Sequence, residues 1–188
     1  MPHRYVVVTG RPGVGKTTLF RRVVERLRSE GYRVGGFVCP EVRAGGRRIG
    51  FRIVSLDGSL EAWLARVEGC DGPRVGRYRV CREAERVARE AVERALREAD
   101  LVAIDEIGPM ELRSPGIRSA ILEALRSGKP GFFVAHLRLS DPDILPVLRR
   151  EGVWFTVTLE NRDVLPDRVY EAVLAALRST GAASTTGV

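Results

Sequence analysis

The sequence contains little of several residue types that would point to particular kinds of protein. It has only two lysines, Lys16 and Lys129, three cysteines (Cys39, Cys70 and Cys81), and aromatic residues at 6% of its 188 positions. No apolar run approaches the ~20 residues that span a bilayer, and the N-terminus lacks a signal-peptide pattern, so we expect a cytoplasmic protein with no membrane partner. An odd number of cysteines without metal-ligand spacing predicts unpaired thiols in a reducing compartment.

Positive charge is abundant but spread along the whole chain. The formal net charge is +7, and arginines alternate with glutamates in stretches such as CREAERVAREAVERALREAD. This spacing places Glu–Arg pairs on a solvated helix face. No basic run is interleaved with aromatic residues, as would be typical of a nucleic-acid-binding surface. We therefore expect no dedicated nucleic-acid surface, while the net charge keeps a nucleic-acid-associated activity open as an alternative.

Strand-like apolar runs alternate with amphipathic helical stretches, which is typical of an α/β fold with a mostly parallel central sheet flanked by helices. We expect strands at residues 5–9, 101–108, 131–137 and 153–159, and helices at 16–30, 83–99, 115–127, 142–151 and 166–178. After the first helix, residues 34–58 predict a β-hairpin inserted around a glycine turn. Residues 60–67 predict a short helix or an irregular cover, and 73–80 a loop with a short strand. The pattern predicts one three-layer domain over residues 1–178 and a disordered tail at 179–188.

Residues 10–17, GRPGVGKT, match the P-loop pattern G-x-x-x-x-G-K-[ST] at every position, between an expected strand and an expected helix. The glycines allow turns that direct successive backbone N–H groups at phosphate oxygens. We expect Lys16 to reach the β- and γ-phosphates of a bound nucleotide and the Thr17 hydroxyl to ligate Mg²⁺. The nucleotide-binding residues predicted from this segment are Gly10, Arg11, Pro12, Gly13, Val14, Gly15, Lys16, Thr17 and Thr18.

A P-loop needs an acid to hold its magnesium ion, and the run LVAIDEIG supplies one at the end of a buried strand. Asp105 and Thr17 are therefore the predicted metal ligands. Glu106 follows directly, and a carboxylate beside the metal can orient and deprotonate a water in line with the γ-phosphate, which favours hydrolysis. A helix-start acid or an arginine partner is the alternative role for Glu106. The Asp-Glu pair also predicts an additional strand between the P-loop strand and this one.

Several segments together carry a resemblance to a known family. They are TGRPGVGKTTL, GGFVCPEVRAGGRRIGFRIVSLDG, VGRYRV, IDEIGPMEL and ENRDVLPDRV, spread over residues 4–178. Their order and spacing resemble the thermophilic nucleoside-triphosphatase family, which includes a human relative called cancer-related nucleoside triphosphatase. The resemblance implies a three-layer P-loop NTPase fold with kinase-like features and slow, Mg²⁺-dependent hydrolysis of nucleoside triphosphates with broad base preference. Carried over by position, residues 10–17 and the strand end formed by Asp105, Glu106, Ile107 and Gly108 bind the nucleotide. Lys16 and Glu106 take catalytic roles, with Glu106 as the base. Pro109 departs from the family pattern, which usually has lysine there.

Residues outside the P-loop offer further candidates, each with two interpretations. Asn161 and Arg162, in the segment ENRD after the last strand, are expected to neighbour the nucleotide base, and a helix-entry cap is the alternative. Arg138 either stabilises γ-phosphate charge or is a solvated arginine. His136 is expected to be a packed or hydrogen-bonded strand residue.

The hairpin insertion leaves open whether the phosphoryl group is transferred to water or to another acceptor. Its charged residues Glu41, Arg43, Arg47 and Arg48 either cover the triphosphate or keep an exposed sheet edge soluble. The insertion is also large enough to build a pocket for a phosphoryl acceptor, so a nucleotide or small-molecule kinase with hydrolysis as a side reaction stays an alternative. We expect a monomer with a nucleoside triphosphate as substrate.

Overall fold

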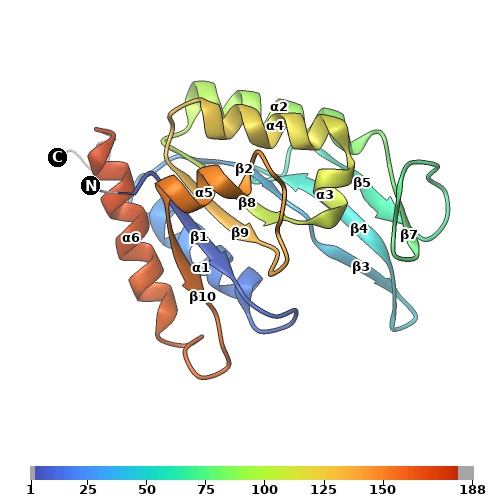
Figure 1. Ribbon diagram of the computed structural model, residues 1–188, viewed down its shortest axis with the longest axis horizontal. Coiled ribbons are helices and arrows are strands. Elements are labelled where there is room, and N and C mark those ends of the chain that lie inside the picture. The colour runs from blue at the N-terminus through green and yellow to red at the C-terminus, as the bar shows by residue number, and fades with distance from the viewer. Residues whose placement is uncertain (1–2, 182–188) are drawn as a thin grey trace.

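The computed structural model describes residues 3–181, and within that range ten strands form a single sheet (Figure 1). The sheet order is β10-β1-β9-β8-β2-β4-β5-β7-β6, with β3 paired to β4 outside this path. The strands are β1 Tyr5–Thr9, β2 Val34–Val38, β3 Glu41–Ala44, β4 Arg47–Ser55, β5 Glu61–Arg66, β6 Arg74–Val75, β7 Tyr78–Val80, β8 Leu101–Ile107, β9 Gly131–Ala135 and β10 Gly152–Thr156. The helices are α1 Lys16–Ser29, α2 Ala84–Glu98, α3 Pro109–Arg113, α4 Pro115–Arg126, α5 Leu145–Glu151 and α6 Leu165–Ser179.

Five neighbouring strands, β10, β1, β9, β8 and β2, run parallel to one another. Strand β9 lies between β1, which leads into the P-loop, and β8, which carries Asp105, so the predicted additional strand is confirmed. Ligands of open parallel sheets bind at the carboxyl ends of the strands. The ends of β1, β9 and β8 therefore meet at the edge where a phosphate site is expected.

Helices cover both faces of this parallel half and make the predicted three layers. Every residue of β1 is buried, as expected for a strand with both faces covered. Val6 and Val8 pack in a cluster with apolar residues of α1 and α6, whereas Tyr5 and Val7 belong to the cluster that includes α2 and α4. Figure 1 shows α2 and α4 side by side along one side of the sheet. The α/β fold class predicted from the alternating pattern is confirmed.

The other half of the sheet is antiparallel. Strands β3 and β4 form the predicted hairpin around the glycine turn. The prediction of a short helix or irregular cover at residues 60–67 was wrong, because this segment is strand β5, paired antiparallel to β4. Burial of Ala62 and Leu64 on one face fits a strand, and Trp63 on the other face lies under the guanidinium groups of Arg52 and Arg66. Pairing with β4 thus makes this segment a strand. The segment is too short for the periodicity of its own apolar residues to distinguish a strand from a helix.

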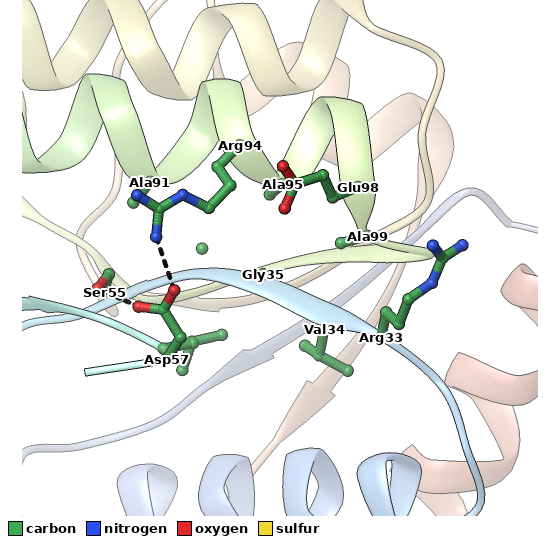
Figure 2. Close-up of a pocket in the computed structure, with 12 residues that line it drawn as sticks. Arg33, Val34, Gly35, Ser55, Asp57, Ala91, Arg94, Ala95, Glu98 and Ala99 are labelled. Atoms are coloured by element: carbon green, nitrogen blue, oxygen red, sulfur yellow. Dashed lines mark hydrogen bonds and ion pairs between the residues drawn. The ribbon is translucent and has the colours of Figure 1, made fainter. Parts of the chain in front are cut away.

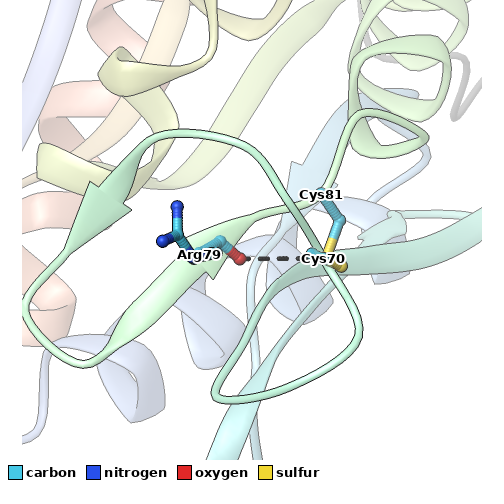
Figure 3. Close-up of a disulfide and its surroundings, with 3 residues drawn as sticks. All are labelled: Cys70, Arg79 and Cys81. Carbon is cyan, nitrogen blue, oxygen red and sulfur yellow. Dashed lines mark hydrogen bonds between the residues drawn. A yellow bond between two sulfur atoms is a disulfide. The ribbon is translucent and has the colours of Figure 1, made fainter.

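The prediction of three unpaired thiols was also wrong, because Cys70 and Cys81 form a disulfide (Figure 3). The segment after β5 folds back so that the Gly72 amide donates to the Val80 carbonyl at 3.1 Å. This return brings the Cα atoms of the two cysteines to 5.1 Å, a separation that a disulfide spans. Cys39 remains a free thiol.

The helix boundaries follow their sequence signals closely. Ser114 is the N-cap of α4, its Oγ accepting a hydrogen bond from the Ile117 amide, and proline occupies the first turn as predicted. Helix α3 was not predicted; Pro109, at the position of the usual family lysine, begins it. Helix α6 ends at Ser179, and residues 182–188 of the predicted tail lie outside the described part of the chain. No helix within residues 3–181 has the length and apolar character of a membrane span.

Candidate functional site

The P-loop connects the end of β1 to the first residue of α1. Gly15 is the N-cap of α1 and adopts φ +115°, a left-handed conformation that residues with a Cβ rarely take. The helix continues immediately, the Leu19 amide donating to the Gly15 carbonyl at 3.0 Å. The unpaired N–H groups of the first turn therefore point out of the helix at the end that attracts anions.

Lys16 is held against the loop that it follows. Its Nζ donates to the Gly10 carbonyl at 2.7 Å and lies 3.7 Å from a carboxylate oxygen of Glu106. The residue is buried, which is unusual for lysine and is compensated by these two partners. Both catalytic residues predicted from the sequence are thus in direct contact across 90 positions of the chain.

The two predicted metal ligands also meet. Thr17 Oγ1 donates to Asp105 Oδ2 at 2.9 Å. Neighbouring oxygens of an octahedral Mg²⁺ site lie about 2.9 Å apart, given metal–oxygen bonds of ~2.1 Å. Burial raises the pKa of Asp105 to about 6, against the hydrogen bond from Thr17, which lowers it. The oxygen chemistry and spacing of this pair fit a magnesium ion.

The Glu106 side chain lies close to a second carboxyl group, that of Glu111 at the third position of α3. A Cβ built on Gly108 would lie 2.9 Å from an oxygen of Glu106 and 3.2 Å from an oxygen of Glu111, so the two carboxyl groups converge over this glycine. Glu111 is buried, and this burial raises its pKa to about 8, with the Glu106 carboxylate adding to the rise. Glu111 was not predicted as a site residue, although a glutamate between the apolar residues Met110 and Leu112 is a usable signal for a buried carboxyl group.

The segment after β10 lies beside the P-loop. The Asn161 side chain accepts from the Thr158 amide at 2.8 Å and donates to the Thr156 carbonyl at 2.9 Å, so its amide closes the turn into α6. Arg162 is exposed, and its Cδ is 3.7 Å from where a Cβ on Gly15 would be. Arg162 therefore lies beside the P-loop, whereas the side chain of Asn161 holds the turn before α6 and caps no helix N–H, because the N-cap of α6 is Val164. Contact with the base stays a prediction for both.

His136 and the hairpin charges make local hydrogen bonds and ion pairs. His136 follows β9, and its Nδ1 accepts a hydrogen bond from the Arg138 amide at 3.0 Å. In the hairpin, Glu41 pairs with Arg43 at 3.0 Å and with Arg48 at 3.5 Å. These pairs hold Glu41, Arg43 and Arg48 within the hairpin, which agrees with the solubility interpretation.

One surface cavity lies apart from the P-loop. The cavity of about 200 Å³ drawn in Figure 2 lies between α2 and the beginning of β2. Arg94 and Asp57 form an ion pair of 2.7 Å at its rim, and Gly35, Ala91 and Ala95 line its wall. Because it adjoins the amino end of β2, it lies at the opposite edge of the parallel strands from Asp105 and belongs to no phosphate site.

Comparison with known proteins gives a consistent family. A sequence model of a family described as NTPase matches residues 5–170. The nucleoside-triphosphatase THEP1 of Hyperthermus butylicus is 66% identical over 181 residues, which cover 95% of this chain and 96% of the relative. The THEP1 of Methanopyrus kandleri is 49% identical, covering 93% of this chain and 97% of the relative.

Solved structures agree with the sequence relatives. The crystal structure of THEP1 from Aquifex aeolicus superposes with a TM-score of 0.75 at 34% identity, covering 88% of this chain and 96% of the other. The solution structure of a human cancer-related nucleoside triphosphatase superposes with a TM-score of 0.74 at 37% identity, covering 90% and 97%. The resemblance inferred from the sequence motifs is confirmed: the chain belongs to the NTPase family of P-loop proteins that includes the THEP1 nucleoside-triphosphatases.

Proposed function

We propose that this protein hydrolyses nucleoside triphosphates to the diphosphate and inorganic phosphate, with Mg²⁺ as cofactor and broad preference for the base. Family membership supports a nucleoside triphosphatase. The finer proposal is that Glu106 positions the attacking water and accepts its proton. The single observation that carries this role is the 3.7 Å approach of the Glu106 carboxylate to Nζ of the P-loop lysine.

The proposed chemistry follows from where the charges lie. Thr17 and Asp105 would hold the magnesium ion, which when bound neutralises charge on the β- and γ-phosphates. Lys16 would exchange its contact with the Gly10 carbonyl for the phosphate oxygens, since both are strong acceptors within its reach. A γ-phosphate bound to Lys16 then lies near Glu106. A water between the phosphate and the Glu106 carboxylate could transfer its proton to Glu106 as its oxygen attacks phosphorus.

Broad base preference is consistent with the rim of the site. Asn161 uses its amide to close the turn into α6, which leaves the exposed Arg162 as the nearby group for the base. A guanidinium plane stacks on any base without reading its edge. We therefore propose that ATP, GTP and other triphosphates are hydrolysed at similar rates.

Phosphate release with each common nucleoside triphosphate, with and without Mg²⁺, tests the proposal. Glu106→Gln should bind ATP with wild-type affinity and hydrolyse it at least about 100-fold more slowly, the usual effect of losing a general base. Glu98→Gln is the matched control, because Glu98 is an exposed residue at the end of α2. Wild-type turnover in Glu106→Gln would remove this residue from the mechanism, and activity in EDTA would remove the metal.

A further inference from the structure

One face of the antiparallel half of the sheet is not covered by α2. Ile53 of β4 and Ala62 and Leu64 of β5 are buried in the cluster that includes residues of α2. Side chains alternate between the two faces of a strand, so Arg52 and Trp63, which pair across β4 and β5, point to the opposite face. Figure 1 shows α1 at the parallel half of the sheet, away from these two strands. We call this opposite side the outer face of β4 and β5, and both Arg52 and Trp63 are only half-buried there.

Two guanidinium groups lie over the Trp63 ring on the outer face. That of Arg66 is 4.3 Å from the ring centroid, and that of Arg52 is 5.1 Å from it. The Arg66 side chain has no ion pair or hydrogen bond within residues 3–181. Arg52 lies 3.4 Å from the exposed Glu61 carboxylate, but its Nε has no hydrogen-bond partner in the same range. The cluster of Arg52, Trp63 and Arg66 therefore combines a flat aromatic surface with hydrogen-bond donors that the chain itself does not fully use.

The segment that contains this cluster carries most of the net charge of the protein. Residues 41–82 include nine arginines and five acidic residues, so they contribute +4 of the chain's +7. Three of the acidic residues, Glu41, Asp57 and Glu61, are already held in ion pairs with arginines. Within residues 3–181, six arginines of the segment form no ion pair: Arg47, Arg66, Arg74, Arg77, Arg79 and Arg82. An excess of unpaired cations of this kind is complementary to a polyanion.

From this arrangement we infer that the outer face of β4 and β5 binds single-stranded nucleic acid. A base stacks on the Trp63 indole in place of one guanidinium, and Arg52 and Arg66 pair with the phosphates beside that base. The exchange is favourable because each guanidinium gives up a cation–π contact for a charge-assisted hydrogen bond to phosphate. A duplex keeps its bases stacked inside, so it cannot use the indole.

The pairing of β4 with β5 explains why the linear sequence predicts no such surface. Arg52 and Trp63 are separated by ten residues in the chain, and neither lies in a basic run interleaved with aromatic residues. Strand pairing places them opposite each other, and the Arg66 guanidinium reaches the same ring. An acidic peptide would satisfy the arginines but would leave the indole unused, so the aromatic ring between the cations favours a nucleic acid.

The test uses fluorescence anisotropy of a labelled uridine oligonucleotide about 12 nucleotides long, with a thymidine oligonucleotide alongside it. Both should bind, because the cluster contacts phosphates and base faces rather than the sugar. Two phosphate contacts on a single strand give a slope of log affinity against log salt of about −1.4, so affinity should fall about sevenfold between roughly 50 and 200 mM salt. No binding of either oligonucleotide at the lower salt concentration overturns the inference.

Arginine variants test the location of the surface. Arg52→Glu and Arg66→Glu should each lower the affinity at least about tenfold, because each replaces a phosphate partner with a repelling charge. Arg97→Glu is the matched control, since it makes the same change of charge at an exposed position of α2, on the covered side of the sheet. An equal loss of affinity in Arg97→Glu overturns the inference, because only the net charge would then matter.

Tryptophan variants test the stacking. Trp63→Ala should lower the affinity at least about fivefold, and Trp63→Phe, which keeps an aromatic ring, should lower it less. The protein has two tryptophans, so Trp154→Phe leaves Trp63 as the sole reporter, and its emission should change when the oligonucleotide binds. Thermal unfolding shows whether each variant is folded. Binding that leaves the Trp63 emission unchanged, or equal affinity for a duplex or an oligoglutamate of the same length, overturns the inference.

Discussion

Thr17 and Asp105 are joined by a hydrogen bond of 2.9 Å although 88 residues separate them in the chain. The bond connects the first turn of the P-loop helix to the end of β8 across the intervening β9. It fixes two oxygens at the spacing of adjacent ligands in an octahedral magnesium site. The fold therefore already brings the two predicted metal ligands together, so that little reorganisation would accompany binding of a magnesium ion.

Lys16→Ala should lower kcat/KM for ATP at least about 100-fold, because one charge-stabilising donor at a transferring phosphate contributes about that much. Phosphate release and titration with a fluorescent ATP analogue measure the effect. Lys129→Ala is the control offered by the only other lysine, which donates to the Ala99 carbonyl at the opposite edge of the sheet. Equal loss of activity in the two variants would contradict a phosphate-binding role for Lys16.

Unfolding by guanidinium chloride should become easier as pH rises from about 6.5 to 8. The unfolded chain loses the Glu111 proton near its ordinary pKa of 4.5, whereas the folded chain keeps it to about 8, so the folded state binds more protons in this window. Raising the pH therefore favours the unfolded state. Glu111→Gln has no such proton, and its free energy of unfolding should vary less over the same window. An identical pH dependence in both proteins would contradict a protonated Glu111.

Gly36→Ala should lower the free energy of unfolding by at least about 2 kcal/mol. Gly36 adopts φ +131° in β2, and an added Cβ would lie 1.9 Å from the Ala103 carbonyl oxygen in the neighbouring strand. Gly45→Ala makes a control, because its φ is also positive, at +56°, but nothing lies within 4 Å of an added Cβ. Chemical denaturation of both variants measures the difference, and similar losses would show that contact with β8 contributes nothing.

Ser114→Ala should lower the free energy of unfolding by about 1 kcal/mol, the typical value for an N-cap. The Ser114 hydroxyl accepts from the Ile117 amide and donates to Glu85 of α2 at 3.0 Å, so it also connects two helices. Thermal unfolding is the measurement. Ser119→Ala, at an exposed position of the same helix, should shift the midpoint little. A wild-type midpoint for Ser114→Ala would rule out the capping contribution.

Cys70→Ser should lower the free energy of unfolding by about 2–3 kcal/mol, since the disulfide closes a loop 11 residues long in sequence separation. Phosphate release should be unchanged, because the disulfide lies in the antiparallel extension of the sheet. Denaturation of the wild type with and without dithiothreitol gives the same comparison without mutation. If dithiothreitol lowers the stability of Cys70→Ser as well, the effect of the reductant does not come from this bond.

Much of the site could be predicted because its chemistry depends on local sequence. The P-loop pattern requires specific residues at fixed spacing, and Asp105 ends an apolar run that only a buried parallel strand explains. Their pairing follows once the carboxyl ends of parallel strands are placed at one edge. These predictions needed no knowledge of distant contacts.

The features that were missed depend on partners far along the chain. Residues 61–66 become a strand through pairing with β4, and the apolar positions in so short a segment fit a helix equally well. The Cys70–Cys81 bond requires the return of the chain after β5, which no cysteine spacing encodes.

The position of β1 between β10 and β9 determines when a newly made chain can first hold a nucleotide. Both strands that flank β1 come late in the sequence: Tyr5 pairs with Gly131 of β9 and with Gly152 of β10. A ribosome adding ~5–20 residues per second produces β10 roughly 7–30 s after β1. The first functional motif to be synthesised is therefore among the last to be completed, and nucleotide binding is a property of nearly the whole translated chain.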